Sequence, residues 1–108
     1  MKVKVIKNHP GEGQFPTFPK GTDVKITDEG CTHFLNWYAC EIEGHATYIP
    51  DVFLANGKLV RDYNPTELIC EAGEILTVKE ILYAWFIAVK ADGIMGWIPA
   101  EVSVSVEE

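Results

Sequence analysis

Two cysteines and two histidines lie close together in the first half of the chain, and all four side chains are common zinc ligands. They are Cys31, His33, Cys40 and His45, with one, six and four residues between them. This spacing matches no familiar zinc motif. We therefore expect buried thiols and loop histidines at these positions, and we predict neither a metal nor any other cofactor.

A cysteine nucleophile activated by a histidine base is the second chemistry that these residue types allow, with Cys70 and His9 as a further pair. The sequence offers no third residue that would orient the base, and no sharp turn that would expose a thiol. The acidic pair Glu71 and Glu74 lies beside a turn, which is typical of solvated surface. We predict that the chain is not an enzyme.

The charge distribution argues against nucleic acid as a partner. The 108 residues carry 9 Lys and Arg against 16 Asp and Glu, a net charge of −7. Residues 1–54 hold five basic and seven acidic side chains, and residues 55–108 hold four and nine. A phosphate backbone needs clustered Lys and Arg. The one basic cluster, Lys2, Lys4 and Lys7, is interpreted as the solvent face of an edge strand.

Cysteine usage and hydropathy favour a reducing compartment. Three cysteines cannot all pair within the chain, and they show no disulfide-framework spacing. Residues 1–7 lack the uninterrupted apolar run of a signal peptide. No stretch approaches the roughly 20 apolar residues that a membrane helix requires. We expect a cytoplasmic protein with no membrane partner.

Apolar and polar residues alternate in short stretches, which predicts strands separated by turns along the whole chain. Asn56-Gly57 is a hairpin turn signal. Residues 75–89 also fit a helical stripe, but the corresponding residues 24–39 contain Asp28-Glu29-Gly30 and cannot form one helix. We therefore predict strand, loop and strand over residues 75–89.

The two halves of the chain carry the same landmarks in the same order, which predicts a tandem repeat. Gly21 corresponds to Gly73, and Trp37 corresponds to Trp85. The offsets drift by a few residues inside loops, where insertions are tolerated. The other matching positions are Pro10 and Pro65, Val24 and Leu76, Ile26 and Val78, and Tyr48-Ile49-Pro50 and Trp97-Ile98-Pro99.

The second half resembles a Src-homology-3 domain. Leu59-Val60-Arg61-Asp62-Tyr63 stands where that family has its Ala-Leu-Tyr-Asp-Tyr opening, and Trp85 stands at the first of its paired tryptophans. Gly96-Trp97-Ile98-Pro99 matches the family's Gly-aromatic-Ile-Pro signature. The first half is similar more weakly, through Pro19-Lys20-Gly21, Trp37-Tyr38 and Tyr48-Ile49-Pro50.

The resemblance implies an all-β fold of two tandem, small, five-stranded Src-homology-3-like barrels. The first barrel is expected over residues 1–55 and the second over residues 56–108. A unit of this size buries only ~60% of its unfolded surface, so each barrel would gain from docking on its twin. The pattern is closest to the Src-homology-3-like modules of bacterial proteins, which keep the barrel and vary the binding groove.

In this family an aromatic groove binds extended, often proline-rich peptides, because polyproline II segments lose little entropy on docking. The second half departs from the groove pattern at Arg61 and Val102, where the family has tyrosines, and the first half has Asn8 at the position of Tyr63. Each groove is therefore partial. The groove positions that the resemblance carries over are Tyr63, Trp85 and Pro99 in the second half and Trp37, Pro50 and Phe53 in the first.

We predict a non-catalytic module that binds a protein or an extended peptide on these partial grooves. The acidic loops favour a basic ligand, and the resemblance favours a proline-rich one. The alternative is a purely structural or oligomerisation domain with occluded grooves, in which the aromatics join the two barrels or a homodimer. A third alternative is an accessory domain for cell-wall peptides. Binding requires Trp37 and Trp85 to form exposed or half-exposed ledges, whereas Trp97 is expected to pack.

Overall fold

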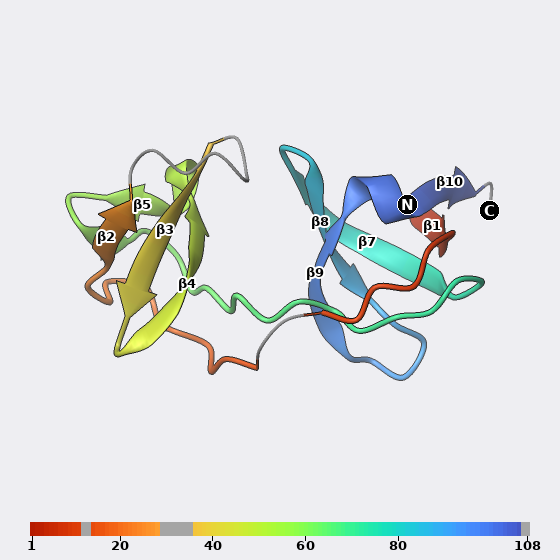
Figure 1. The fold of residues 1–108 in the computed structure, drawn as a ribbon, viewed down its shortest axis with the longest axis horizontal. Coiled ribbons are helices and arrows are strands. Elements are labelled where there is room, and N and C mark those ends of the chain that lie inside the picture. Colours follow the sequence, from red (N-terminus) through yellow and green to blue (C-terminus); the bar gives the residue numbers. More distant parts are fainter. Residues whose placement is uncertain (12–13, 29–35, 107–108) are drawn as a thin grey trace. The chain divides into compact units, whose positions relative to one another are not determined.

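The computed structural model describes residues 1–11, 14–28 and 36–106. Within this part of the chain all regular structure is strand or 3-10 turn, so the predicted all-β class is confirmed (Figure 1). The chain divides into two compact units. Unit 1 comprises Met1–Gln14 and Thr66–Glu108, and unit 2 comprises Phe15–Pro65.

Unit 1 is built on one antiparallel sheet with the strand order β10-β1-β7-β8-β9. In Figure 1 the red strand β1 accordingly accompanies the teal and blue strands from the other end of the chain. The elements of unit 1 are β1 (Lys2–Val5), β7 (Ile75–Leu82), β8 (Trp85–Val89), β9 (Met95–Pro99), the 3-10 turn η2 (Ala100–Val102) and β10 (Ser103–Val106).

Strand β1 lies inside this sheet, so its interpretation as an edge strand is wrong. Lys4 is the register partner of Val104 on β10 and of Ile75 on β7. The alternation itself is confirmed, because Val3 and Val5 are buried while Lys4 is exposed. The lysines therefore mark the solvent face of a central strand. A local pattern shows which face of a strand is buried but not whether a neighbour covers its edges.

The core of unit 1 forms where β1 meets the other strands of the sheet. Its residues come from both ends of the chain, so neither segment buries its apolar face alone. Val78 and Phe86 pack against this core from β7 and β8. The buried core residues are Val3, Val5, Leu68, Cys70, Leu76, Ala88, Ile98 and Val102.

Residues 75–89 form a β-hairpin, which confirms the choice of strands over a helix. Strand β7 continues to Leu82, so the predicted loop shrinks to the turn at Tyr83 and Ala84. Tyr83 adopts a left-handed φ of 55° at this turn. The helical stripe in the sequence has no structural counterpart, because antiparallel pairing with β8 satisfies the backbone of this segment.

Unit 2 contains a three-stranded sheet, β2-β3-β4, and a two-stranded sheet, β5-β6. Asn56 and Gly57 connect β5 to β6 with φ of 54° and 76°, as a hairpin turn with two left-handed residues requires. The elements of unit 2 are β2 (Lys25–Asp28), β3 (Trp37–Ile42), β4 (His45–Pro50), the 3-10 turn η1 (Asp51–Phe53), β5 (Leu54–Ala55) and β6 (Lys58–Leu59).

The two units differ from the halves expected at residues 1–55 and 56–108. The N-terminal residues belong to unit 1 because β1 pairs with β7 and β10. Residues 58–63 belong to unit 2 because Lys58 bridges to Asp23 and Tyr63 bridges to Phe18. Within the described residues no sheet closes on itself.

Gly96 allows the chain segment before β7 to cross close to β9. The Trp97 amide donates to the Thr66 carbonyl over 3.0 Å, and the Leu68 amide donates to the Trp97 carbonyl over 2.8 Å. A Cβ atom at residue 96 would lie 2.9 Å from the Leu68 nitrogen and 3.0 Å from the Thr66 oxygen. Both neighbours are backbone atoms, so neither can move aside without breaking this pairing.

Replacing Gly96 by alanine should therefore destabilise the protein by about 1–3 kcal/mol, the usual cost of overpacking. Urea unfolding of the full chain measures this change. Gly57→Asn is the matched control, because residue 57 has open space around its Cβ position and asparagine tolerates its left-handed φ. Equal midpoints for Gly96→Ala and wild type would contradict the close approach.

Candidate functional site

The structure divides the six predicted groove residues between the two units differently from the prediction, which placed three in each half. Trp85 and Pro99 lie in unit 1, whereas Trp37, Pro50 and Phe53 lie in unit 2. Tyr63, expected beside Trp85, belongs to unit 2. Its ring packs edge-on against Phe53 at 5.4 Å between centroids, and its hydroxyl donates to the Tyr48 carbonyl over 2.5 Å.

Trp85 and Pro99 form a half-buried ledge at one end of the unit 1 sheet. They are register partners on β8 and β9, and both are partly exposed. Phe86, the next residue on β8, packs against the core, so Trp85 points to the opposite face of the strand. The Ala100 amide donates to the Ala84 carbonyl over 2.8 Å and ties η2 to the hairpin turn beside the ledge. The expectation of a half-exposed Trp85 is confirmed.

His9 lies at the edge of the Trp85 ring, where no groove residue was predicted. The two ring centroids are 6.5 Å apart at an interplanar angle of 72°. His9 Nδ1 lies 2.7 Å from the Leu68 carbonyl oxygen, and His9 Nε2 lies 3.1 Å from Glu67 Oε1. Both neighbours are acceptors, so a doubly protonated imidazolium would make two hydrogen bonds where the neutral ring makes one.

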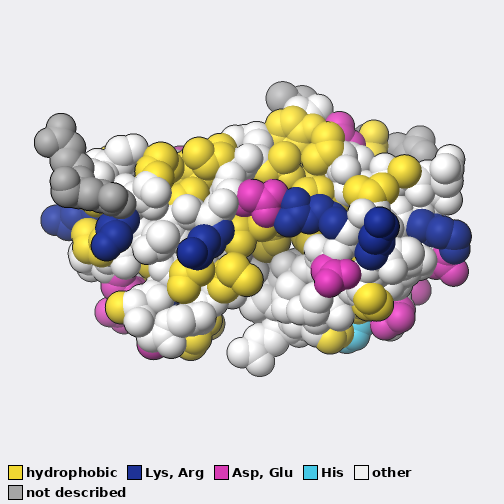
Figure 2. All heavy atoms as spheres, turned by 180° about the vertical axis from the view of Figure 1, so that it is seen from behind, with side chains coloured by type: hydrophobic (Ala, Val, Ile, Leu, Met, Phe, Trp, Pro, Cys, Tyr) yellow, Lys and Arg dark blue, Asp and Glu magenta, His cyan; other side chains and the backbone are white. Residues whose placement is uncertain are grey.

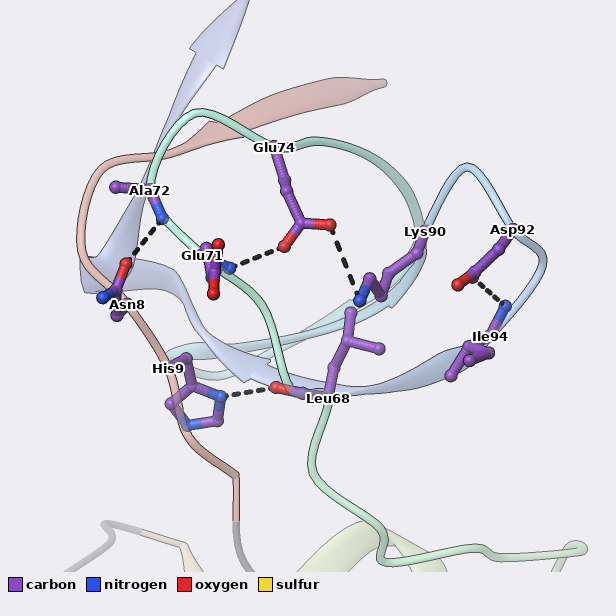
Figure 3. A network of polar contacts seen from close by, with 9 residues as sticks. All are labelled: Asn8, His9, Leu68, Glu71, Ala72, Glu74, Lys90, Asp92 and Ile94. Atoms are coloured by element: carbon purple, nitrogen blue, oxygen red, sulfur yellow. Dashed lines mark hydrogen bonds and ion pairs between the residues drawn. The ribbon is translucent and has the colours of Figure 1, made fainter.

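Polar contacts join the segment of Asn8 and His9 to residues 68–74, which include Glu71 and Glu74 (Figure 3). Glu74 accepts a hydrogen bond from the Glu71 amide over 2.6 Å, and its other oxygen lies 3.5 Å from Lys90 Nζ. The Asn8 side-chain oxygen accepts a hydrogen bond from the Ala72 amide over 2.9 Å. Together these contacts fasten residues 8–9 to residues 68–74. Glu67 is the acidic side chain next to His9, which lies at the edge of the Trp85 ring.

Exposed apolar side chains extend the ledge. Tyr83 is 42% exposed in the turn before Trp85, and Leu82 is the register partner of Trp85 on β7. Figure 2 shows that hydrophobic side chains lie next to acidic and basic ones on one face of the protein. A surface with an aromatic ledge, neighbouring apolar groups and acidic side chains can hold an apolar segment that also carries positive charge.

The aromatic cluster of unit 2 is buried. Trp37 and Pro50 are register partners on β3 and β4, the same arrangement as Trp85 and Pro99 in unit 1. Trp37 is only 7% exposed, and Phe53 and Tyr63 are each 3% exposed. The expectation that Trp37 forms an exposed ledge is therefore wrong. Phe53 and Tyr63 pack edge-on against each other in the same unit, so the core of unit 2 is rich in aromatic carbon.

The cysteines and histidines show no arrangement for metal binding in the described residues. Cys31 and His33 lie outside the described residues. His45 packs instead against two aromatic rings, with centroids 5.9 Å from Phe15 and 5.7 Å from Phe18. No group of three or more His, Cys, Asp or Glu suited to a metal occurs among residues 1–11, 14–28 and 36–106.

Burial makes both described thiols poor nucleophiles. It raises the pKa of Cys40 from its ordinary value of 9.0 to about 12. The pKa of Cys70 is also raised, first by burial and then by Glu74, with Lys90 and a backbone hydrogen bond from His9 acting in the opposite direction. The two ring nitrogens of His9 contact the Leu68 carbonyl and the Glu67 carboxylate. The Cys70 and His9 pair therefore lacks the lowered thiol pKa that a cysteine nucleophile needs.

Trp97 is 3% exposed, as expected of a packing residue. His9 and Glu67 are the site residues that the sequence interpretation missed. A different alignment of the two repeats would have found His9. Aligning Val5 with Leu59, which are both buried, matches His9 to Tyr63, whereas aligning Pro10 with Pro65 matches Asn8 to Tyr63.

Comparison with protein-family models, with curated proteins and with solved structures gave no match for this sequence. In the part of the chain that the structure describes, no helix has the length and apolarity needed to cross a membrane.

Cys40 should react with a thiol reagent only after unfolding. Because its pKa in the folded protein is about 12 and its ordinary value is 9.0, the thiolate is scarce in the fold at pH 8. The folded state prefers the protonated thiol of Cys40. The contribution of this thiol to the free energy of unfolding is therefore complete below pH 9 and is lost as the pH rises toward 12.

Alkylation with iodoacetamide, read for the Cys40 peptide by mass spectrometry, measures the reaction. The same peptide in 8 M urea (about the concentration that unfolds a small domain) is the control. Equal alkylation rates in the folded and unfolded protein at pH 8 would contradict the burial of this thiol.

Proposed function

We propose that this chain is a non-catalytic binding module made of two Src-homology-3-like units, and that unit 1 binds an extended basic peptide on Trp85 and Pro99. The observation that carries the proposal is the half-exposed Trp85 beside Pro99, the residue before a 3-10 turn. His9 lies at the edge of the Trp85 ring and pairs with the acidic Glu67. The five strands of unit 1 in their antiparallel order support a small five-stranded barrel.

The chemistry of the ledge selects the ligand class. Tryptophan and proline side chains pack well against the rings of a polyproline II segment, which has little conformational entropy left to lose. The Glu67 side chain is 23% exposed. A Lys or Arg of the ligand can therefore reach its carboxylate and be attracted to it. A proline-rich peptide or protein segment with adjacent basic residues fits both features. The free thiols Cys40 and Cys70 agree with a role in the reducing cytoplasm.

Trp85→Ala should weaken peptide binding by about tenfold or more, which corresponds to 1.4 kcal/mol per factor of ten. The probe is a fluorescent proline-rich peptide with flanking arginines, titrated by anisotropy against the full chain. A second peptide with glutamates in place of the arginines should bind more weakly, because it repels the acidic side chains.

Ile94→Ala is the matched control for this experiment. Ile94 is 58% exposed and precedes β9, at the opposite end of that strand from Pro99. Its loss should leave the affinity within about twofold. Absence of binding by the wild-type chain, or equal binding by wild type and Trp85→Ala, would exclude the ledge as a peptide site. A muropeptide used as a third probe tests the cell-wall alternative.

For unit 2, burial favours the structural alternative. Its aromatic cluster of Trp37, Pro50, Phe53 and Tyr63 has the residue types of a groove but little exposed surface. We propose that this cluster stabilises the unit and that unit 1 carries the ligand site. A homodimer or a joint between barrels remains the alternative use of these aromatics.

Trp37→Ala should therefore destabilise unit 2 by about 3–5 kcal/mol, the usual cost of deleting a buried aromatic side chain. Thermal unfolding followed by circular dichroism measures the loss. Val52→Ala, at a 54% exposed apolar position on the neighbouring 3-10 turn, should cost less than about 0.5 kcal/mol. A cost for Trp37→Ala as small as that of the control would show that Trp37 is not a core residue.

A further inference from the structure

Both units are closed by the same backbone hydrogen bonds. In unit 1 the Gly73 amide donates to the Val5 carbonyl over 2.7 Å, and the Val5 amide donates to the Glu74 carbonyl over 2.9 Å. In unit 2 the same two bonds recur at different residues. They run from the Gly21 amide to the Leu59 carbonyl over 2.8 Å, and from the Leu59 amide to the Thr22 carbonyl over 2.9 Å.

Three further contacts repeat in the same way. His9 and Cys70 exchange both backbone hydrogen bonds in unit 1, as Tyr63 and Phe18 do in unit 2. The Ile6 amide donates to the Val102 carbonyl in unit 1, and the Val60 amide donates to the Phe53 carbonyl in unit 2. The Ala72 amide donates to the Asn8 side chain in unit 1, and the Lys20 amide donates to the Asp62 side chain in unit 2.

The equivalent residues are related by constant offsets. Opening segments differ by 54 residues, since residues 5, 6, 8 and 9 correspond to 59, 60, 62 and 63. The segments that receive them differ by 52 residues, since 18, 20, 21 and 22 correspond to 70, 72, 73 and 74. The shifts in strand register are also 52 residues apart, since one lies between Ile26 and Asp28 and the other between Val78 and Glu80. Chance does not reproduce two fixed offsets over so many contacts.

In each unit the two sides of these contacts come from different repeats. Residues 5–9, from the first repeat, bond to residues 70–74 of the second repeat. Residues 59–63, from the second repeat, bond to residues 18–22 of the first. A simple tandem arrangement would instead join residues 5–9 to 18–22 and residues 59–63 to 70–74, with the same number of backbone hydrogen bonds.

We infer that the two repeats have exchanged their opening segments within one chain. As a consequence, His9 of the first repeat, and not Tyr63 of the second, is the residue beside Trp85 in the ligand site of unit 1. The role of His9 toward a ligand rests on the proposed function, whereas the exchange itself does not.

Side chains select the exchanged pairing, because the backbone bonds are equivalent in both arrangements. Tyr63 and Arg61 both contact Phe53, the arginine with its guanidinium carbon 4.5 Å from the ring centroid. In the simple tandem arrangement they would face Val102, the residue equivalent to Phe53, and would lose both aromatic contacts.

His9 favours the same choice. Its ring nitrogens face the Leu68 carbonyl and the Glu67 carboxylate in the exchanged pairing. The offset of 52 makes Phe15 the counterpart of Glu67, so the tandem arrangement would replace the carboxylate by a phenyl ring. The polar network around Asn8 and His9, seen in Figure 3, thus joins one repeat's opening segment to the other repeat's turn.

Methyl and aromatic NOEs in the full-length chain distinguish the two pairings without any ligand. Val3 and Leu76 are register partners, so the exchange predicts NOEs between their methyl groups. It also predicts NOEs between the rings of Tyr63 and Phe53 and between those of His9 and Trp85. The simple tandem arrangement predicts NOEs from Val3 to Val24 and from Tyr63 to Val102. Phe86 and Ile98 are register partners in one repeat and serve as the internal control.

A sample that mixes chains labelled with ¹³C and unlabelled chains separates contacts within one chain from contacts between copies. Val3–Leu76 and Tyr63–Phe53 NOEs within one chain would support the exchange. NOEs from Val3 to Val24, or Val3–Leu76 NOEs that arise only between chains, would overturn it. If the exchange NOEs are present and the basic proline-rich peptide does not bind, the proposed function fails and the exchange stands.

Titration with that peptide then tests His9. The His9 ring resonances and the Trp85 indole resonance should shift together with one binding curve, and the His9→Ala chain should bind at least threefold more weakly. Binding with unshifted His9 resonances and unchanged affinity in His9→Ala would remove His9 from the site.

Discussion

The pairing of an opening segment with the turn that precedes β7 in unit 1, or β2 in unit 2, closes each unit, and the remaining structure depends on it. In unit 1 this pairing inserts β1 between β7 and β10 and brings Val3 and Val5 into the core. The partners lie more than sixty residues apart in the sequence, so the entropy of closing a long loop opposes the pairing. Burial of apolar side chains from both segments compensates for that entropy loss.

The same pairing constructs the candidate site. It places His9 against the Trp85 ring and fastens it through Glu67, Leu68 and the neighbouring turn. The ledge itself comes from the register of β8 and β9, which sets Trp85 opposite Pro99. A rigid hairpin thus supplies the apolar part of the site, and a segment from the other end of the chain supplies the polar edge.

Two sets of similar residues have acquired different environments in this protein. Trp85 with Pro99 and Trp37 with Pro50 occupy equivalent positions of two hairpins. In unit 2 the second pair is buried, as are Phe53 and Tyr63, whose rings pack edge-on against each other. In unit 1 Val102 stands at the position of Phe53, and Trp85 and Pro99 keep part of their surface in solvent. Two residue differences accompany this change from an aromatic core to an aromatic ledge, Val102 for Phe53 on the 3-10 turn and His9 for Tyr63 in the opening segment.

The amino-acid sequence by itself determined the all-β class, the repeat landmarks and the inward positions of a strand such as β1. These follow from alternation, from turn residues such as Asn56-Gly57, and from apolar residues that must avoid water. Only the tertiary structure decided which opening segment joins which unit, that Trp37 is buried, and that His9 meets Glu67 and Trp85. Alternation reports one strand's faces and contains no information on its partners. The choice between two arrangements with equal backbone hydrogen bonding depends on side-chain contacts between residues far apart in the chain.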